Sequence, residues 1–187
     1  MAAPYLDADA RTLRGLAHPI RQKLMYELYA RGTSTATTLA EALSEPVNSV
    51  SFHLRQLARY DLIEEAPEQG KDGRQRWWRP AASEGIHIST KIEEESAEGR
   101  AAFALFRRHS VATWHALIDR FFGPHDDTVE VWANNDVPML LTDDEARQCA
   151  EELYSVMRKW HEHGQRRQPP GDPEPRTYLA VSMILPH

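Results

Sequence analysis

The chain has 187 residues, of which 41% are hydrophobic and 27% charged, and its formal net charge is −6. This composition is typical of a globular protein and excludes a chain that stays unfolded for lack of apolar residues. The sequence has neither the roughly 20 apolar residues of a transmembrane helix nor a signal peptide, and its single cysteine excludes an internal disulfide, so we expect a cytoplasmic protein.

The two halves of the chain differ in charge. Residues 1–80 contain 11 basic and 10 acidic side chains, whereas residues 81–187 contain 11 basic and 18 acidic ones. The acidic excess therefore lies in the second half. A negative total does not exclude a nucleic-acid-binding surface in the first half, because the local arrangement of charge decides such binding.

Helical periodicity dominates the first part of the chain. Apolar residues recur at intervals of three and four, His18-Pro19 suits a helix start, and Gly32 suits a helix end. A cluster of serine and threonine before Ala36 offers hydroxyl groups that can cap a helix. We therefore predict helices over residues 7–17, 18–31, 33–43 and 47–60.

The fourth predicted helix has an unusual polar face. At 100° per residue, Val47, Val50, Leu54 and Leu57 share the core side. Arginine, asparagine and glutamine recognise base edges, and an apolar ring can contact a thymine methyl group. We therefore expect four residues of the opposite face to read bases, namely Asn48, Phe52, Arg55 and Gln56. Four more would position the DNA backbone, namely Ser49, Ser51, His53 and Arg59.

A basic β-hairpin is predicted after this helix. Residues 61–66 and 73–80 have strand-like sequences, and Asp72-Gly73 between them is a strong hairpin signal. Basic side chains in such a hairpin suit contacts with phosphates or the minor groove. We expect Lys71, Arg74 and Arg76 to make them.

Residues 10–80 resemble the winged helix-turn-helix domain of ArsR-type transcriptional regulators. The resemblance rests on LAHPIRQKLMYEL (16–28), TLAEAL (38–43), VSFHLRQL (50–57), DLIEE (61–65) and GRQRWWR (73–79). It implies a dimer that binds a palindromic operator and usually represses transcription. Metal-sensing members carry cysteines at the start of the helix before the turn, whereas TSTATTLAEAL (33–43) has none. A thiolate metal sensor of that kind is therefore not expected.

The second half predicts an α+β arrangement with a long helix and a small β-β-α-β unit. The long helix follows the acidic residues 91–99 and ends near Phe122. Strands are predicted within residues 128–142 and over 176–186, the latter buried in a sheet, with a helix from a capping box at Thr142 to about His163. We therefore predict a DNA-binding domain over residues 1–85 and a dimerisation domain, which could also bind an effector, over 86–187.

Two weaker site hypotheses concern this second half. His115 and Asp119 are four residues apart on the long helix and are weak candidates for a metal site. We favour the interpretation that they are ordinary polar residues on the surface, because a full ligand set is not evident. Trp114 and Trp132 could line a small-molecule pocket, although aromatic core is the commoner role. No catalytic constellation stands out, so we expect neither an enzyme nor a cofactor.

The sequence therefore favours a homodimeric regulator that binds double-stranded DNA sequence-specifically, with a small-molecule effector left open and no membrane association. The competing hypothesis is a winged-helix protein-interaction module that does not bind DNA, in which Phe52 and Trp77 form an apolar contact patch. Salt dependence distinguishes the two, because phosphate contacts release counterions.

Overall fold

The computed structural model describes residues 5–69, 75–89, 92, 96–124, 133, 137–166 and 176–184. Contacts within the chain divide it into two units, Met1–Gly123 and Pro124–His187, which we call unit 1 and unit 2. The predicted long helix belongs to unit 1. The division between the two units therefore falls after Gly123, later than the domain boundary predicted between residues 85 and 86. That domain boundary stays a prediction. The described residues combine helices with small sheets, which confirms the α+β class.

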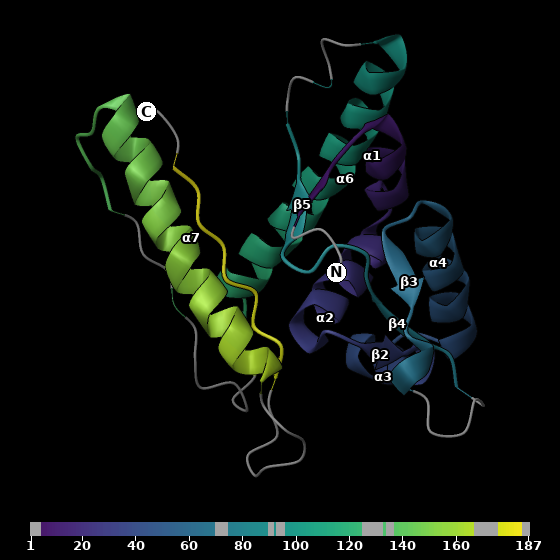
Figure 1. The fold of residues 1–187 in the computed structure, drawn as a ribbon. Helices are drawn as coiled ribbons and strands as arrows, with labels where there is room; N and C mark the ends of the chain where they lie inside the picture. Colours follow the sequence, from purple (N-terminus) through teal and green to yellow (C-terminus); the bar gives the residue numbers. More distant parts are fainter. Residues whose placement is uncertain are drawn as a thin grey trace. The chain divides into compact units, whose positions relative to one another are not determined.

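The first four helices of the chain lie in unit 1 (Figure 1). Asp9 caps the first by accepting a hydrogen bond from the Thr12 backbone at 2.7 Å, and Thr35 caps the third in the same way from Thr38 at 3.2 Å. Such caps satisfy N–H groups that have no partner within the helix. The helices are α1 (Ala10–Leu16), α2 (Pro19–Arg31), α3 (Ala36–Leu43) and α4 (Val47–Arg59), which confirms the four predicted ones.

Two small sheets complete unit 1. Strand β4 (Trp77–Pro80) pairs antiparallel with β3 (Ile63–Glu65) on one side and with β2 (Ser34–Thr35) on the other. The two predicted hairpin strands are therefore paired, whereas residues 70–74 lie outside the described residues. Strand β1 (Tyr5–Asp7) pairs in parallel with β5 (Gly85–His87), and sequence periodicity predicted neither this pair nor β2.

The core of unit 1 lies where the helices meet the three-stranded sheet. Each helix contributes one side, and Trp78 of β4 covers part of the cluster. The side chains that are wholly inaccessible to solvent include Leu24, Leu28, Leu39, Val50, Leu54 and Leu57. Burial of each such residue stabilises the fold by about 1.5–3 kcal/mol before the loss of conformational entropy.

The long helix α6 (Ala97–Phe122) extends from this core, capped by Ser96, whose hydroxyl accepts from the Gly99 backbone at 2.9 Å. Its first turns pack on α1, where Ala102 and Ile92 cover Leu13. Its later turns carry exposed apolar side chains, including Ile118 and Phe122. The predicted apolar flank therefore belongs to this helix, and part of it is uncovered in unit 1. Of the predicted acidic start, Glu98 lies in the first turn of α6, whereas residues 93–95 lie outside the described residues.

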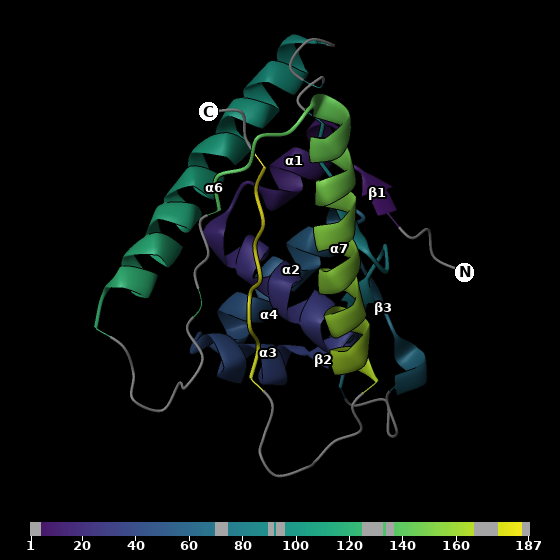
Figure 2. The same cartoon turned by 90° about the vertical axis from the view of Figure 1, so that its left-hand side faces the viewer.

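Unit 2 contains helix α7 (Asp143–Gln165), whose predicted capping box is present: Thr142 and Glu145 bond to each other's backbone N–H groups. Figure 2 shows residues 176–184 as an elongated segment beside α7. No residue of α7 is buried. None of its side chains is therefore part of a core like that of unit 1.

The strands predicted in unit 2 are wrong wherever the structure describes them. Residue 133 and residues 137–142 and 176–184 form no strand, and Tyr178 is 59% exposed instead of buried in a sheet. Alternating apolar side chains favour an extended backbone, but a strand also needs a neighbour for its hydrogen bonds. Both sheets formed by described residues lie in unit 1. The remaining residues of these predicted strands lie outside the described residues.

Candidate nucleic-acid interface

Helix α4 has one buried and one exposed face, as its periodicity predicts. Val50, Leu54 and Leu57 are fully buried, whereas Phe52 is 50% exposed. Val47 departs from the prediction, because it is 45% exposed at the first turn and does not reach the core. The helix therefore presents an aromatic ring to its surroundings while three aliphatic side chains hold it in place.

The predicted base-reading residues lie on the outer side of α4. Asn48, Phe52 and Arg55 are exposed and Gln56 is half-buried. The Asn48 side-chain oxygen accepts a hydrogen bond from the Ser49 backbone at 2.9 Å, which holds it at the start of the helix. Among the predicted backbone-contacting residues, Ser49, Ser51 and His53 are half-buried and Arg59 is exposed.

The arginines of α4 are not neutralised by the nearby acids. Glu64 accepts from Arg79 at 2.7 Å, and Glu65 forms an ion pair with Arg76 at 3.3 Å. Both acids therefore pair within the sheet. Within the described ranges, Arg55 makes no ion pair, so its guanidinium group can bind an anion or a base.

A groove joins α4 to the start of α3 and to the hairpin. Its volume is about 330 Å³, and its walls combine hydroxyl groups, guanidinium groups and apolar side chains. Arg76 lies 5.7 Å from the centre of the Trp78 ring, which orients its side chain toward the sheet. The lining residues are Thr35, Ala36, Thr37, Val47, Ser51, Arg55, Gln75, Arg76 and Trp78.

Six of these lining residues were not predicted as site residues, namely Thr35, Ala36, Thr37, Val47, Gln75 and Trp78. Thr37, Val47 and Gln75 reach the groove because α3, α4 and the hairpin converge there. Helical spacing placed Val47 in the core, and periodicity carries no signal that would bring Gln75 to α4. Of the predicted hairpin residues, Arg76 lines the groove, whereas Lys71 and Arg74 lie outside the described residues.

His53 forms a ring pair with a residue from another helix. Its ring centre lies 4.5 Å from that of His18, the residue immediately before α2, with the planes tilted by 41°. On its other side His53 meets Phe52 edge-on at 5.1 Å. The sequence did not predict this pair, because only the fold brings His18 and His53 together.

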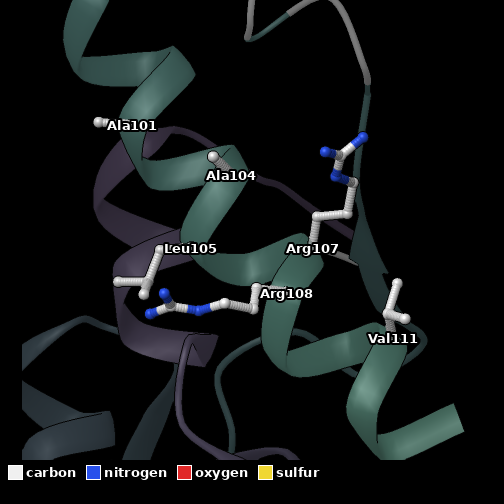
Figure 3. Close-up of a pocket in the computed structure, with 6 residues that line it drawn as sticks. All are labelled: Ala101, Ala104, Leu105, Arg107, Arg108 and Val111. Atoms are coloured by element: carbon white, nitrogen blue, oxygen red, sulfur yellow. The ribbon is translucent and has the colours of Figure 1, made fainter. Parts of the chain in front are cut away.

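The weaker hypotheses gain no support from the described geometry. His115 and Asp119 are exposed on α6, and within the described ranges no group of three or more histidine, cysteine, aspartate or glutamate side chains could hold a metal ion. A hollow in unit 1 is lined by residues of α6, and its Arg107 and Arg108 side chains point in different directions (Figure 3). Trp132, of the predicted pocket, lies outside the described residues, and no described helix is long and apolar enough to cross a membrane.

Comparison with known proteins gives one informative match. The model of a family described as a helix-turn-helix domain matches residues 16–66. A solved structure of a Lactococcus lactis ZitR mutant in its apo form is 17% identical over 75% of this chain and 82% of that chain, with a TM-score of 0.29. No curated protein matches the chain. Residues 16–66, which include α2, α3 and α4, are therefore similar to helix-turn-helix domains.

Proposed function

We propose that the protein is a transcriptional regulator that binds double-stranded DNA in a sequence-specific way. The observation that carries this proposal is the outer face of α4, where Phe52 is exposed between Asn48 and Arg55 while nearby acids pair elsewhere. An exposed aromatic ring flanked by amide and guanidinium groups suits the major groove, where it can contact a thymine methyl group. In this account, DNA covers Phe52.

Each part of the interface has a distinct role in this proposal. Helix α4 enters the major groove, where the exposed face reads bases through Asn48, Phe52, Arg55 and Gln56. Ser49, Ser51, His53 and Arg59 contact the backbone, as do Lys71, Arg74 and Arg76 of the hairpin. The groove between α4 and the hairpin suits one phosphate group, because hydroxyl and guanidinium groups line it together.

We further propose that the protein acts as a homodimer, as the resemblance to ArsR-type regulators implies, and represses transcription from a palindromic operator. Residues 86–187 would supply the dimer contacts. The support is the apolar surface of this region, which includes Val111, Ile118 and Phe122 on α6 and Val156 and Trp160 on α7, all exposed in their own units. Exposed apolar side chains that cluster on one face are typical of interaction sites.

The proposal is tested by the affinity of wild-type protein and matched variants for duplexes that differ at single base pairs. Arg55→Ala should cost about 1–3 kcal/mol and relax discrimination at one position, because a base contact is lost. Arg59→Ala should weaken every duplex alike. Lys23→Ala, which removes an exposed charge from α2, serves as the control. An equal loss for all duplexes in Arg55→Ala would contradict the base-reading assignment.

A second candidate function is a protein-interaction module. The exposed ring of Phe52 and the half-buried Trp77 would form its contact patch. An apolar contact of this kind changes little with salt, whereas DNA binding through several phosphates weakens steeply between 50 and 200 mM salt. Binding that did not depend on salt would favour this candidate.

A further inference from the structure

The His18–His53 pair lies on the flank of the proposed DNA-reading helix. Within unit 1, His18 precedes α2, His53 belongs to α4, and the ring centres are 4.5 Å apart. The Nδ1 atom of His53 is buried and has no hydrogen-bond partner in the described part of the chain. A buried polar atom without a hydrogen-bond partner lowers the stability of the folded protein, so this arrangement of His53 carries an energetic penalty.

The charged groups around the pair are mostly basic. Arg21 of α2 lies beside both rings, with its guanidinium group 5.7 Å from the Tyr60 ring centre and donating to the Arg14 carbonyl at 3.0 Å. His109 of α6 faces His18. Glu45, before α4, is the acid that acts on His53. Among the described residues, Glu45 is therefore the one carboxylate that acts on the pair, and it acts on His53 alone.

Burial and positive neighbours both disfavour a charge on the pair. Burial lowers the pKa of His18, and Arg21 and His109 lower it further. Burial also lowers the pKa of His53, with further lowering by His18 and Arg21 that Glu45 partly opposes. In free protein at neutral pH both rings are therefore uncharged.

We propose that DNA binding takes up a proton on the His18–His53 pair, so that the affinity for DNA rises as the pH falls. This inference rests on the proposed function, in which His53 approaches the phosphate backbone. Phosphates add the negative charge that the free protein lacks around these rings. An imidazolium ion is therefore more stable in the complex than in the free protein, and the complex binds more protons.

The pair takes up one proton and not two. Two imidazolium ions at a ring separation of 4.5 Å, next to Arg21, would repel each other strongly. The two rings therefore titrate as a coupled unit. One proton linked to binding raises the affinity by at most about tenfold for each unit of pH.

The test is calorimetric titration of the full-length protein with a DNA duplex enriched from a random pool, at pH 6.5, in two buffers of different ionisation enthalpy. The difference between the two apparent enthalpies gives the number of protons taken up. The expected result is an uptake that approaches about one proton as the pH is lowered. His87→Asn, which removes an exposed histidine of β5, should take up as many protons as wild type.

Two variants identify which of the two rings takes up the proton. His53→Gln removes the ring that approaches DNA and should bind DNA without proton uptake; circular dichroism verifies that it is folded. His18→Asn keeps a residue suited to the start of α2 while it removes the ring that, when charged, lowers the pKa of His53. The pH at which affinity begins to rise should therefore move upward in this variant.

The outcomes separate this inference from the proposed function. DNA binding without proton uptake in wild type, or equal uptake in His53→Gln and wild type, would overturn the inference and leave the proposed function intact. If no DNA were bound at any pH, both would fall. An unchanged pH response in His18→Asn would contradict the coupling between the two rings.

Discussion

The side-chain amide of Gln22 on α2 donates a hydrogen bond to the hydroxyl of Ser110 on α6 at 3.1 Å. The same nitrogen donates to the Leu16 carbonyl at 3.1 Å, and the Thr113 hydroxyl donates to the Gln22 oxygen at 3.2 Å. Gln22 is 5% exposed, so a buried polar network joins α6 to the helix-turn-helix domain. Because each of these groups has a partner, the network fixes how the long helix docks.

Replacement of Gln22 tests this network. Gln22→Ala should lower the free energy of unfolding by about 1–3 kcal/mol, because buried hydroxyl and carbonyl groups lose their partner. Lys23→Ala, at the neighbouring exposed position, should change it by less than about 0.5 kcal/mol. Urea unfolding monitored by circular dichroism measures both. Equal effects of the two substitutions would show that the network contributes nothing.

Gly15 on α1 is predicted to be irreplaceable for a steric reason. A methyl group there would lie 2.6 Å from Leu62 Cδ1 and 2.9 Å from Tyr60 Cβ. Gly15→Ala should therefore destabilise unit 1 by about 1–3 kcal/mol through overpacking. Gly164→Ala on α7 is the matched control, because no atom lies within 4 Å of the added carbon. It should stabilise its helix by about 0.5–1 kcal/mol; thermal unfolding compares the two variants, and a neutral Gly15→Ala would contradict this packing.

Stability should depend on pH through the two paired histidines. Both have a pKa below the ordinary value of 6.5 in the folded protein, so the unfolded chain binds more protons as the pH falls below 6.5. Stability is then highest above that pH and declines as the pH falls through 6.5 toward the lowered values. Urea midpoints at pH 7.5, 6.5 and 5.5 measure this decline. His18→Asn should flatten it, whereas an equally steep decline would place its cause elsewhere.

Asp9 should make the stability of the protein depend on pH in a second, more acidic range. Its pKa is lowered chiefly by the hydrogen bond from the Thr12 backbone, so this cap is lost only as the pH falls below the ordinary value of 3.8. Asp9→Asn should retain a cap without this titration. The two windows do not overlap, so acid titration of wild type and Asp9→Asn separates their contributions.

The helix-turn-helix domain was predictable because its elements are set by local patterns. The spacing of Val50, Leu54 and Leu57 defines the inner face of α4, and burial confirms it. The pairing of β1 with β5 was not predictable from the sequence, since it joins three-residue strands from distant parts of the chain. The strands predicted in unit 2 failed for a related reason: an apolar pattern near Tyr178 favours extension but cannot supply the neighbouring strand.

Part of the proposed DNA-binding site was likewise predictable from the sequence, and part of it was not. Arg55 and Phe52 are exposed because they lie opposite the periodic core residues, so their positions followed from the sequence. The groove did not follow from the sequence, because it depends on how the hairpin meets α3 and α4. The His18–His53 contact is likewise a product of tertiary packing, and neither ring carries a sequence signal for the other.

The hairpin tip offers a test of phosphate binding. Lys71→Ala should weaken binding to all DNA sequences alike and reduce the slope of log affinity against log salt by about one unit, because one fewer counterion is released. Binding measured between 50 and 200 mM salt gives the slope for wild type and variant. Identical slopes would show that Lys71 does not contact a phosphate.

The measurement that tests the central claim most directly is the selection of bound duplexes from a random pool by the purified full-length protein at moderate salt. A dimer that reads DNA through α4 should enrich a palindrome whose half-sites lie about one helical turn apart, or a multiple of it. Retention of no DNA at any salt concentration would contradict the account, and the exposed ring of Phe52 would then require a protein partner.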